Sequence, residues 1–211
     1  MGMADQNAVF ATSNPMQISF ILDAIIQLRP ESIVDIGCGS GKYGVLLREY
    51  LPKARIDGVE GFSPYVTEVH RTIYDNIFET NALDFAAQMT RGYNLAIMID
   101  MFEHLTPADG ERLLTLLRTR TGSILISVPV CHPTQEAIHG NALQEHRAQY
   151  DAAILRRLGF GQIFRISGSY IALLGPMTIR LRGKALKCAV TALLPEWANR
   201  ALAPFSRKFH Q

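Results

Sequence analysis

Apolar residues in this sequence follow two different spacings, and the two spacings alternate along the chain. Short runs such as residues 32–36 and 95–100 carry apolar side chains at nearly every position, which is typical of strands buried on both faces. Other segments, such as residues 15–29, repeat apolar residues at helical spacing and end at a proline. The expected strands cover residues 32–36, 54–60, 76–80, 95–100, 123–128, 162–166 and 170–174, and the expected helices cover residues 15–29, 42–51, 64–74, 107–120 and 144–158.

The alternation of strands and helices indicates βαβ units and a parallel sheet. The last two expected strands are joined by a short connection through Gly168, which indicates a hairpin-like ending. We therefore predict an α/β fold: a Rossmann-like, mainly parallel seven-stranded sheet with helices on both faces and an antiparallel last strand. In such sheets the ligand site lies beyond the carboxyl ends of the strands.

The composition fits one globular domain with a small appendage. The chain has 211 residues, of which 48% are hydrophobic and 19% are charged. Its three cysteines are widely spaced and odd in number, which argues against a disulfide scaffold. The N-terminal residues lack the pattern of a signal peptide, and no apolar run reaches the roughly 18 residues of a membrane span. We expect a cytoplasmic protein.

The charge of the chain is distributed unevenly. Residues 180–211 hold seven of the 21 basic residues but one of the 19 acidic residues. Apolar residues also recur there at helical spacing, at Leu186, Ala189, Val190, Leu193, Leu194 and Trp197. We therefore divide the chain into a domain at residues 1–175, which includes the N-terminal helix, and a basic amphipathic tail at residues 176–211.

Two roles of the tail remain open. It packs against its own domain or a second subunit, or it contacts the inner face of a membrane peripherally through residues 180–211. Its aromatic residues are not interleaved with the basic ones as a stacking platform needs, so we expect no nucleic-acid partner. The sequence predicts no particular oligomeric state.

A glycine-rich loop follows the first expected strand. Gly37, Gly39 and Gly41 occupy alternate positions between this strand and a helix. Glycine permits a tight turn with positive φ and lets a ligand approach the backbone. The first N–H groups of the following helix are available to that ligand.

The residues next to this loop exclude two common nucleotide sites. A dinucleotide fingerprint needs glycine at position 42, which is Lys42. A phosphate-binding P-loop that ends at Gly41-Lys42 needs glycine at position 36 and Ser or Thr at position 43, which are Ile36 and Tyr43.

An acidic residue, Asp35, comes two positions before the first of these glycines. A G-x-G-x-G loop with such an acid resembles motif I of the class I methyltransferases that use S-adenosylmethionine (SAM). The resemblance covers roughly residues 15–175 and implies SAM as the cofactor. It implies that SAM contacts Asp35, Gly37, Cys38, Gly39, Gly41, Glu60, Asn81, Ala82, Asp100 and Met101.

Two of these implied contacts have a clear chemical reason. Glu60 ends the second strand, where the family holds both ribose hydroxyls with the two oxygens of a carboxylate. Asn81 stands where the family commonly has an acid that contacts the adenine amino group, and its amide oxygen can accept from that group. Asp84 makes this contact instead if the register is shifted by three residues.

Asp100 and the Glu103-His104 pair follow the fourth strand and look like motif IV of the family. With the segments 42–44, 47–49 and 140–146, the pair resembles a group of small bacterial methyltransferases linked with polysaccharide and cell-envelope chemistry. The resemblance implies methyl transfer to a small-molecule or glycan-type acceptor, at oxygen. The alternatives are a metal-assisted O-methyltransferase of a membrane lipid or quinone precursor, and a non-catalytic SAM-binding module that regulates a partner.

Methyl transfer to a hydroxyl needs a base, and histidine has a suitable pKa. His132 begins the loop after the fifth strand, and His146 starts the expected helix 144–158, so either can serve as the base, with Asp100 beside the methionine end of SAM. Both histidines have an alternative role, which is to hold the loop by hydrogen bonds.

Asp100, Glu103 and His104 also form a set of metal-ligating residues within one turn. Some quinone and RNA 2′-O-methyltransferases resemble this arrangement and use a divalent ion to hold the acceptor oxygens. The alternative is that Glu103 and His104 hydrogen-bond locally beside the pocket. We expect this alternative, with no metal ion.

Overall fold

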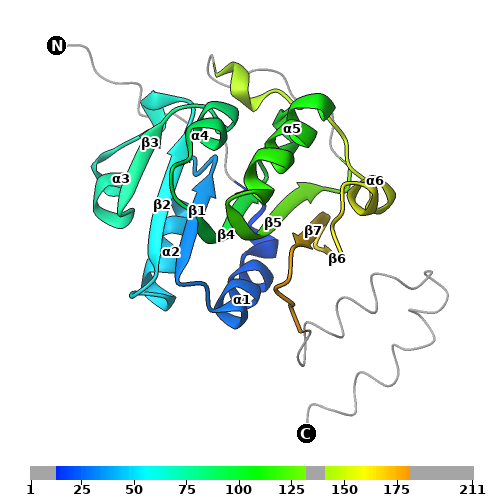
Figure 1. Ribbon diagram of the computed structural model, residues 1–211, viewed down its shortest axis with the longest axis horizontal. Helices are drawn as coiled ribbons and strands as arrows, with labels where there is room; N and C mark the ends of the chain where they lie inside the picture. Colours follow the sequence, from blue (N-terminus) through cyan, green and yellow to red (C-terminus); the bar gives the residue numbers. More distant parts are fainter. Residues whose placement is uncertain (1–12, 132–140, 181–211) are drawn as a thin grey trace, which may run out of the picture.

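A seven-stranded sheet runs through the centre of the computed structural model in Figure 1, which describes residues 13–131 and 141–180. Its strands are β1 (Ser32–Ile36), β2 (Arg55–Glu60), β3 (Asn76–Glu79), β4 (Tyr93–Ile99), β5 (Thr121–Pro129), β6 (Gln162–Ile166) and β7 (Ser169–Leu174). Their order is β3-β2-β1-β4-β5-β7-β6. β7 runs antiparallel to both of its neighbours, and the other pairs are parallel. The predicted α/β sheet is confirmed, with the last strand inserted between β5 and β6.

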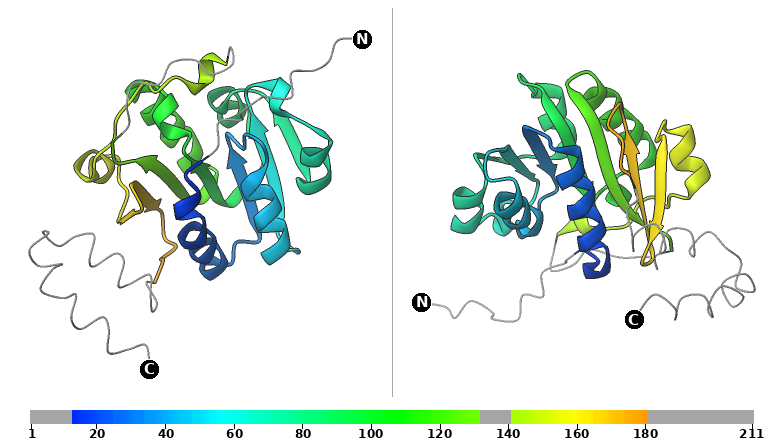
Figure 2. Two further views of the ribbon diagram at one scale, coloured as in Figure 1. Left: turned by 180° about the vertical axis from the view of Figure 1, so that it is seen from behind. Right: turned by 90° about the horizontal axis from the view of Figure 1, so that it is seen from below.

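Helices cover both faces of this sheet, as predicted. One face carries α1 (Ile18–Leu28), α2 (Lys42–Tyr50) and α3 (Glu68–Ile73), and the other carries α4 (Ala82–Gln88), α5 (Pro107–Arg118) and α6 (Ala152–Arg157). α4 and α5 lie in front of the sheet in Figure 1, and α1 and α2 lie in front of it in the left view of Figure 2. Four single turns of 3-10 helix connect these elements: η1 (Pro15–Gln17), η2 (Ser63–Tyr65), η3 (Phe102–His104) and η4 (Ala142–Gln144).

The side chains of β4 alternate between the two hydrophobic layers. Leu95 and Ile97 belong to the layer under α1, α2 and α3, whereas Ala96 and Met98 belong to the layer under α4, α5 and α6. All four are fully buried. Because both faces of the strand are covered, both sets of positions are apolar, which explains the unbroken apolar run in the sequence.

Two helices are shorter than predicted. The segment 64–74 contains η2 and then α3, which starts only after a capping box formed by Thr67 and His70. The segment 144–158 contains the end of η4 and then α6, which starts only after Asp151, because Asp151 caps the helix by accepting a hydrogen bond from the Ile154 N–H at 2.7 Å. The prediction that His146 starts a helix is therefore wrong.

The helix α4 is absent from the sequence prediction. Asn81 caps it, since its Oδ1 accepts from the Asp84 N–H at 2.9 Å and its Nδ2 donates to Asp84 Oδ2 at 2.5 Å. Phe85 and Ala86 of α4 are buried against the sheet. The cap and this apolar pair hold a short helix whose length gives it little stability by itself.

The first residues of the predicted tail lie against the domain. Ile179 is buried, its N–H donates to Gln162 Oε1 at 2.8 Å, and its carbonyl accepts from Gln162 Nε2 at 3.0 Å. Residues 181–211 lie outside the described part of the chain, so the boundary at residue 175 stays a prediction. Among the described helices, none has the length and apolarity needed to cross a membrane.

Gly44 of α2 tests how closely this helix packs on the sheet. A Cβ at Gly44 would overlap the ring of Tyr74. We expect Gly44→Ala to lower the free energy of unfolding by about 1–3 kcal/mol because of this overlap, although alanine favours a helix. Val45→Ala, at an exposed position of the same helix, should change it by less than roughly 0.5 kcal/mol. Urea unfolding of the three proteins measures both effects, and a Gly44→Ala protein as stable as the wild type would contradict the close packing.

Candidate active site

A cavity of about 590 Å³ lies at the carboxyl ends of the central strands. Its walls come from the loop after β1, from residues that follow β4 and β5, and from the turn between β6 and β7. The strand order reverses between β1 and β4, and ligands of open α/β sheets bind at such a reversal. The volume is typical of a small-molecule site. Six of the predicted site residues line the cavity: Asp35, Gly37, Cys38, Gly39, Asp100 and His146.

The three glycines of the loop all have positive φ, namely 75° at Gly37, 54° at Gly39 and 81° at Gly41. Gly37 lies so close to Met101 that a Cβ would overlap this side chain. A Cβ at Gly39, by contrast, would meet no atom of the described residues within 4 Å. The loop therefore presents bare backbone to the cavity at Gly39, which fits the close approach of a ligand such as SAM.

Gly39 is held from both sides of its peptide unit. Its N–H donates to Glu60 Oε2 at 2.8 Å, and its carbonyl lies 2.8 Å from His70 Nε2. His70 Nδ1 accepts from the Thr67 N–H at 3.1 Å, so Nε2 carries the proton and donates to Gly39. His70 is a site residue that the sequence did not reveal, because only the fold brings α3 under the loop.

Glu60 supports the loop more directly than expected. Its second oxygen, Oε1, accepts from the Phe62 N–H at 2.8 Å, and the side chain is buried. Burial raises the pKa of Glu60, while the N–H groups of Phe62 and Gly39 oppose this rise. Glu60 does not line the cavity, so its predicted contact with a ribose stays a prediction.

Asp35 lies beneath the loop and accepts a hydrogen bond from the Tyr74 hydroxyl at 2.7 Å. Burial raises the pKa of Asp35 to about 7, with a further rise from the charge of Glu60, whereas the Tyr74 hydrogen bond lowers it. The loop therefore rests on a carboxyl group that is neutral in mildly acidic solution.

The remaining predicted SAM contacts lie outside the lining of the cavity. Gly41 is the N-cap of α2, and Asn81 is the N-cap of α4, which begins at Ala82. Met101 packs against Gly37 behind the loop. Their contacts with SAM stay predictions, and the described hydrogen bonds of the Asn81 side chain serve the helix cap.

Asp100 lines the cavity in a left-handed backbone conformation, with φ of 50°. Its Oδ2 accepts from the Asn14 N–H at 2.9 Å and from Gln17 Nε2 at 2.7 Å, and Ser127 Oγ donates to Oδ1 at 2.7 Å. The N-terminal segment and β5 thus fix this carboxylate in the wall. No pattern in the sequence indicates that residues 14–17 reach the site.

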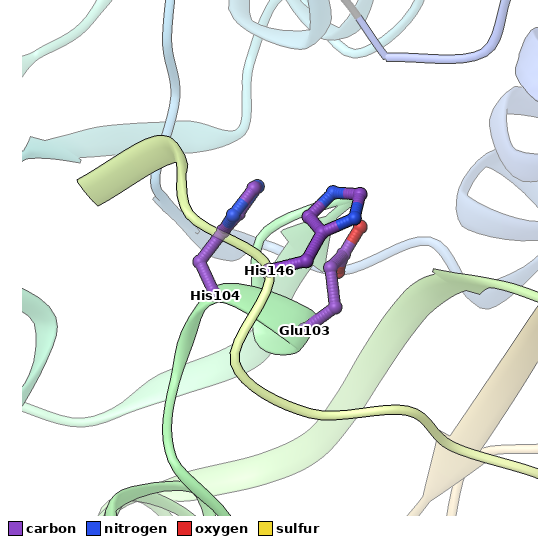
Figure 3. Close-up of side chains that lie close together, drawn as sticks. All are labelled: Glu103, His104 and His146. Carbon is purple, nitrogen blue, oxygen red and sulfur yellow. The ribbon is translucent and has the colours of Figure 1, made fainter. Parts of the chain in front are cut away.

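Glu103, His104 and His146 meet at one side of the cavity, and Figure 3 shows the three side chains extending in the same direction. One potential ligand atom of each lies within 4.8 Å of the others. Burial, and then the charge of Asp100, raises the pKa of Glu103 well above its usual range. The sequence grouped Asp100 with Glu103 and His104, whereas the structure brings His146 to them. His132, the other predicted base, lies outside the described residues.

Asp35→Asn tests the electrostatic environment of the loop. Folding raises the pKa of Asp35 from 3.8 to about 7, so between these values the folded protein holds a proton that the unfolded chain has lost. Stability from this group therefore falls as the pH rises through this window. From pH 5 to pH 8, Asp35→Asn should gain on the order of 2 kcal/mol relative to the wild type in urea unfolding. An equal difference between the two proteins at both pH values would contradict the assignment.

The sequence matches the family described as "Methyltransferase domain" over residues 14–160. No curated protein matches it significantly. Among solved structures, the fold is similar to that of an O-methyltransferase family protein from Burkholderia thailandensis, with a TM-score of 0.58, 12% identity, and coverage of 76% of this chain and 55% of that one.

Two further structures show the same fold similarity. PigF with SAH has a TM-score of 0.54 and 16% identity, covering 74% of this chain and 61% of that chain. The plantazolicin methyltransferase BpumL with SAH has a TM-score of 0.53 and 17% identity, covering 68% and 63%. The chain thus spans less than two thirds of each of these proteins. Since the family match covers most of the described residues and these solved structures share the fold, the chain belongs to the methyltransferase domain family and has the fold of SAM-dependent methyltransferases.

Proposed function

We propose that the chain transfers the methyl group of SAM to an oxygen of a small-molecule or glycan-type acceptor. The observation that carries this proposal is the cavity of about 590 Å³, with bare glycine backbone at Gly39 on one wall and the Glu103, His104 and His146 side chains on another. SAM supplies an activated methyl on a sulfonium, so the protein contributes binding, orientation and removal of the acceptor proton.

The charge around the cavity supports this choice of cofactor. Asp35, Asp100 and Glu103 line the cavity, and Asp35 and Glu103 are almost fully buried. A cationic ligand suits such a wall better than an anionic one, because a nearby cation favours ionisation of the buried carboxyl groups and an anion opposes it. In this assignment the loop at 37–41 packs beside the methionine part and the adenosine of SAM, and the Glu60 carboxylate accepts from the ribose hydroxyls.

The choice of an oxygen acceptor rests on the imidazoles. A hydroxyl must lose a proton when it is methylated, and a histidine near neutral pKa can take it. His146 lines the cavity and is a candidate for this base, with His132 as the second candidate. The similarity to the O-methyltransferase family protein from Burkholderia thailandensis is consistent with this acceptor atom.

The partners and location of the protein remain predictions. They are peripheral membrane contact through residues 180–211, a cytoplasmic location and the absence of a nucleic-acid partner, and residues 181–211 lie outside the described part of the chain. A cavity of this volume is typical of a small-molecule site, which favours a small acceptor.

The function is tested by a methyl-transfer assay with tritium-labelled SAM. The purified chain is incubated with lipid, glycan and small-molecule fractions of a bacterial extract, and the label is followed in each. We expect label in the glycan or small-molecule fraction. Mass spectrometry should identify the labelled product as a methyl ether or a methyl ester. SAM binding without transfer to any fraction would indicate a non-catalytic module instead.

Glu60→Gln tests the SAM site separately from transfer. The variant keeps the size of the side chain but replaces one acceptor by an NH₂ group that faces a backbone N–H, so the loop loses a charged hydrogen bond. We expect SAM affinity, measured by calorimetry, to fall by roughly 10- to 100-fold. Glu79→Gln is the matched control, because Glu79 ends β3 beside Glu60 and pairs with Arg71 at the surface. Equal affinities of the two variants would overturn the role of Glu60.

A further inference from the structure

We propose that Glu103, His104 and His146 form a binding site for a divalent transition-metal ion of the zinc class in the wall of the cavity. The sequence led us to expect no metal here, and it grouped Asp100 with the first two residues. The fold replaces Asp100 in this cluster by His146, and three observations on the cluster support an ion.

The first observation is that the backbone holds the two contributing segments together. The carbonyl of Glu103 accepts hydrogen bonds from the N–H groups of Arg147, at 2.9 Å, and Ala148, at 3.1 Å. The rings of Phe102 and Tyr150 also pack together, with centroids 4.9 Å apart. These contacts fix the non-helical segment that follows η4 onto η3, so His146 reaches Glu103 through defined geometry.

The second observation concerns the protonation of His104. Its Nδ1 lies 3.1 Å from the carbonyl oxygen of Glu145, and a carbonyl only accepts, so Nδ1 carries the proton. The lone pair of the ring is then on Nε2. A metal-binding histidine usually donates its other N–H to a carbonyl or carboxylate in this way, which fixes its tautomer and its orientation.

The third observation is a buried carboxylate oxygen. The Glu103 side chain is 2% exposed, and its Oε2 has no hydrogen-bond partner among the described residues. Leaving such an oxygen unsatisfied is unfavourable, and a bound ion is one of the few groups that satisfy it. Figure 3 shows this carboxylate beside the His146 ring, where an ion would contact both.

The ligand set selects the class of ion. Two imidazoles and one carboxylate suit zinc and its neighbours, whereas magnesium and calcium prefer oxygen ligands. Ligand atoms about 2.0–2.2 Å from a tetrahedral zinc lie roughly 3.4 Å apart. The potential ligand atoms of the three residues lie within 4.8 Å of one another, so small rotations of the two partly buried imidazoles bring them to this spacing. Three protein ligands leave a coordination position open, and all three residues line the cavity.

The catalytic consequence rests on the proposed function. An acceptor hydroxyl at the open position would lose its proton to water more readily, because a divalent ion lowers the pKa of a bound hydroxyl. His146 is then a metal ligand and does not act as the base. Metal binding itself does not depend on this step, and it is tested without the acceptor.

The test is a calorimetric titration of the full chain with Zn²⁺, after purification without a histidine tag and removal of bound metal by a chelator. We expect one equivalent of Zn²⁺ to bind. Glu103→Gln and His146→Gln should each weaken this binding by at least roughly 10-fold, the loss that even an outer partner of a metal site causes. Glu145→Gln is the control, because its carboxylate pairs with Arg147 outside the cluster, and it should bind as the wild type does.

Urea unfolding of the same samples shows that each variant is folded. The proposal is overturned if the wild type binds no stoichiometric Zn²⁺, or if folded Glu103→Gln and His146→Gln proteins bind it as tightly as the wild type. Methyl transfer by a protein that binds no Zn²⁺ would refute the metal site alone. Zn²⁺ binding by a protein that transfers no methyl group would support the metal site and refute the proposed function.

Discussion

The hydrogen bond from the Gly39 N–H to Glu60 is the interaction on which the site depends. Gly39 adopts a left-handed conformation, and a Cβ at this position would meet no atom of the described residues within 4 Å. Side-chain packing therefore does not hold Gly39 in place. Glu60 from β2 and His70 from α3 replace that packing by binding the N–H and the carbonyl of this one residue. The loop can thus expose its backbone to a ligand and still keep a defined position.

This arrangement has an electrostatic consequence for the whole cavity. The carboxyl groups that support the loop from below are buried. Burial raises the pKa of both Asp35 and Glu60, and the charge of Glu60 adds to the rise at Asp35. Glu103 adds a third buried carboxyl group on the opposite wall. Desolvated acids gain most from cations, so the same features that stabilise the loop favour a sulfonium ligand on one side of the cavity and a metal ion on the other.

Local sequence patterns were sufficient for the sheet, because strands buried on both faces leave unbroken apolar runs and the glycine loop has a fixed spacing. They were not sufficient where a single polar side chain decides a helix boundary. The cap formed by Asn81 and Asp84 is visible in the sequence and could have predicted α4. For α6, the apolar spacing of residues 144–158 suggested a longer helix, although Asp151 caps the helix and makes it start at Ala152. Contacts such as His70 with Gly39 and Asn14 with Asp100 join distant segments, and no local pattern encodes them.

The cluster of Glu103, His104 and His146 shows why the site needed the fold. Asp100 and Glu103 are close in sequence, yet the left-handed turn at Asp100 directs its carboxylate to Gln17 and Ser127. The next residues form η3, whose last carbonyls remain available for partners outside the turn. The segment carrying His146 occupies the Glu103 carbonyl with the N–H groups of Arg147 and Ala148. A helix that began at residue 144 could not do this with both groups, because its Ala148 N–H would pair with the Gln144 carbonyl. The failure of the predicted helix at 144–158 is therefore the reason that His146 reaches the cavity wall.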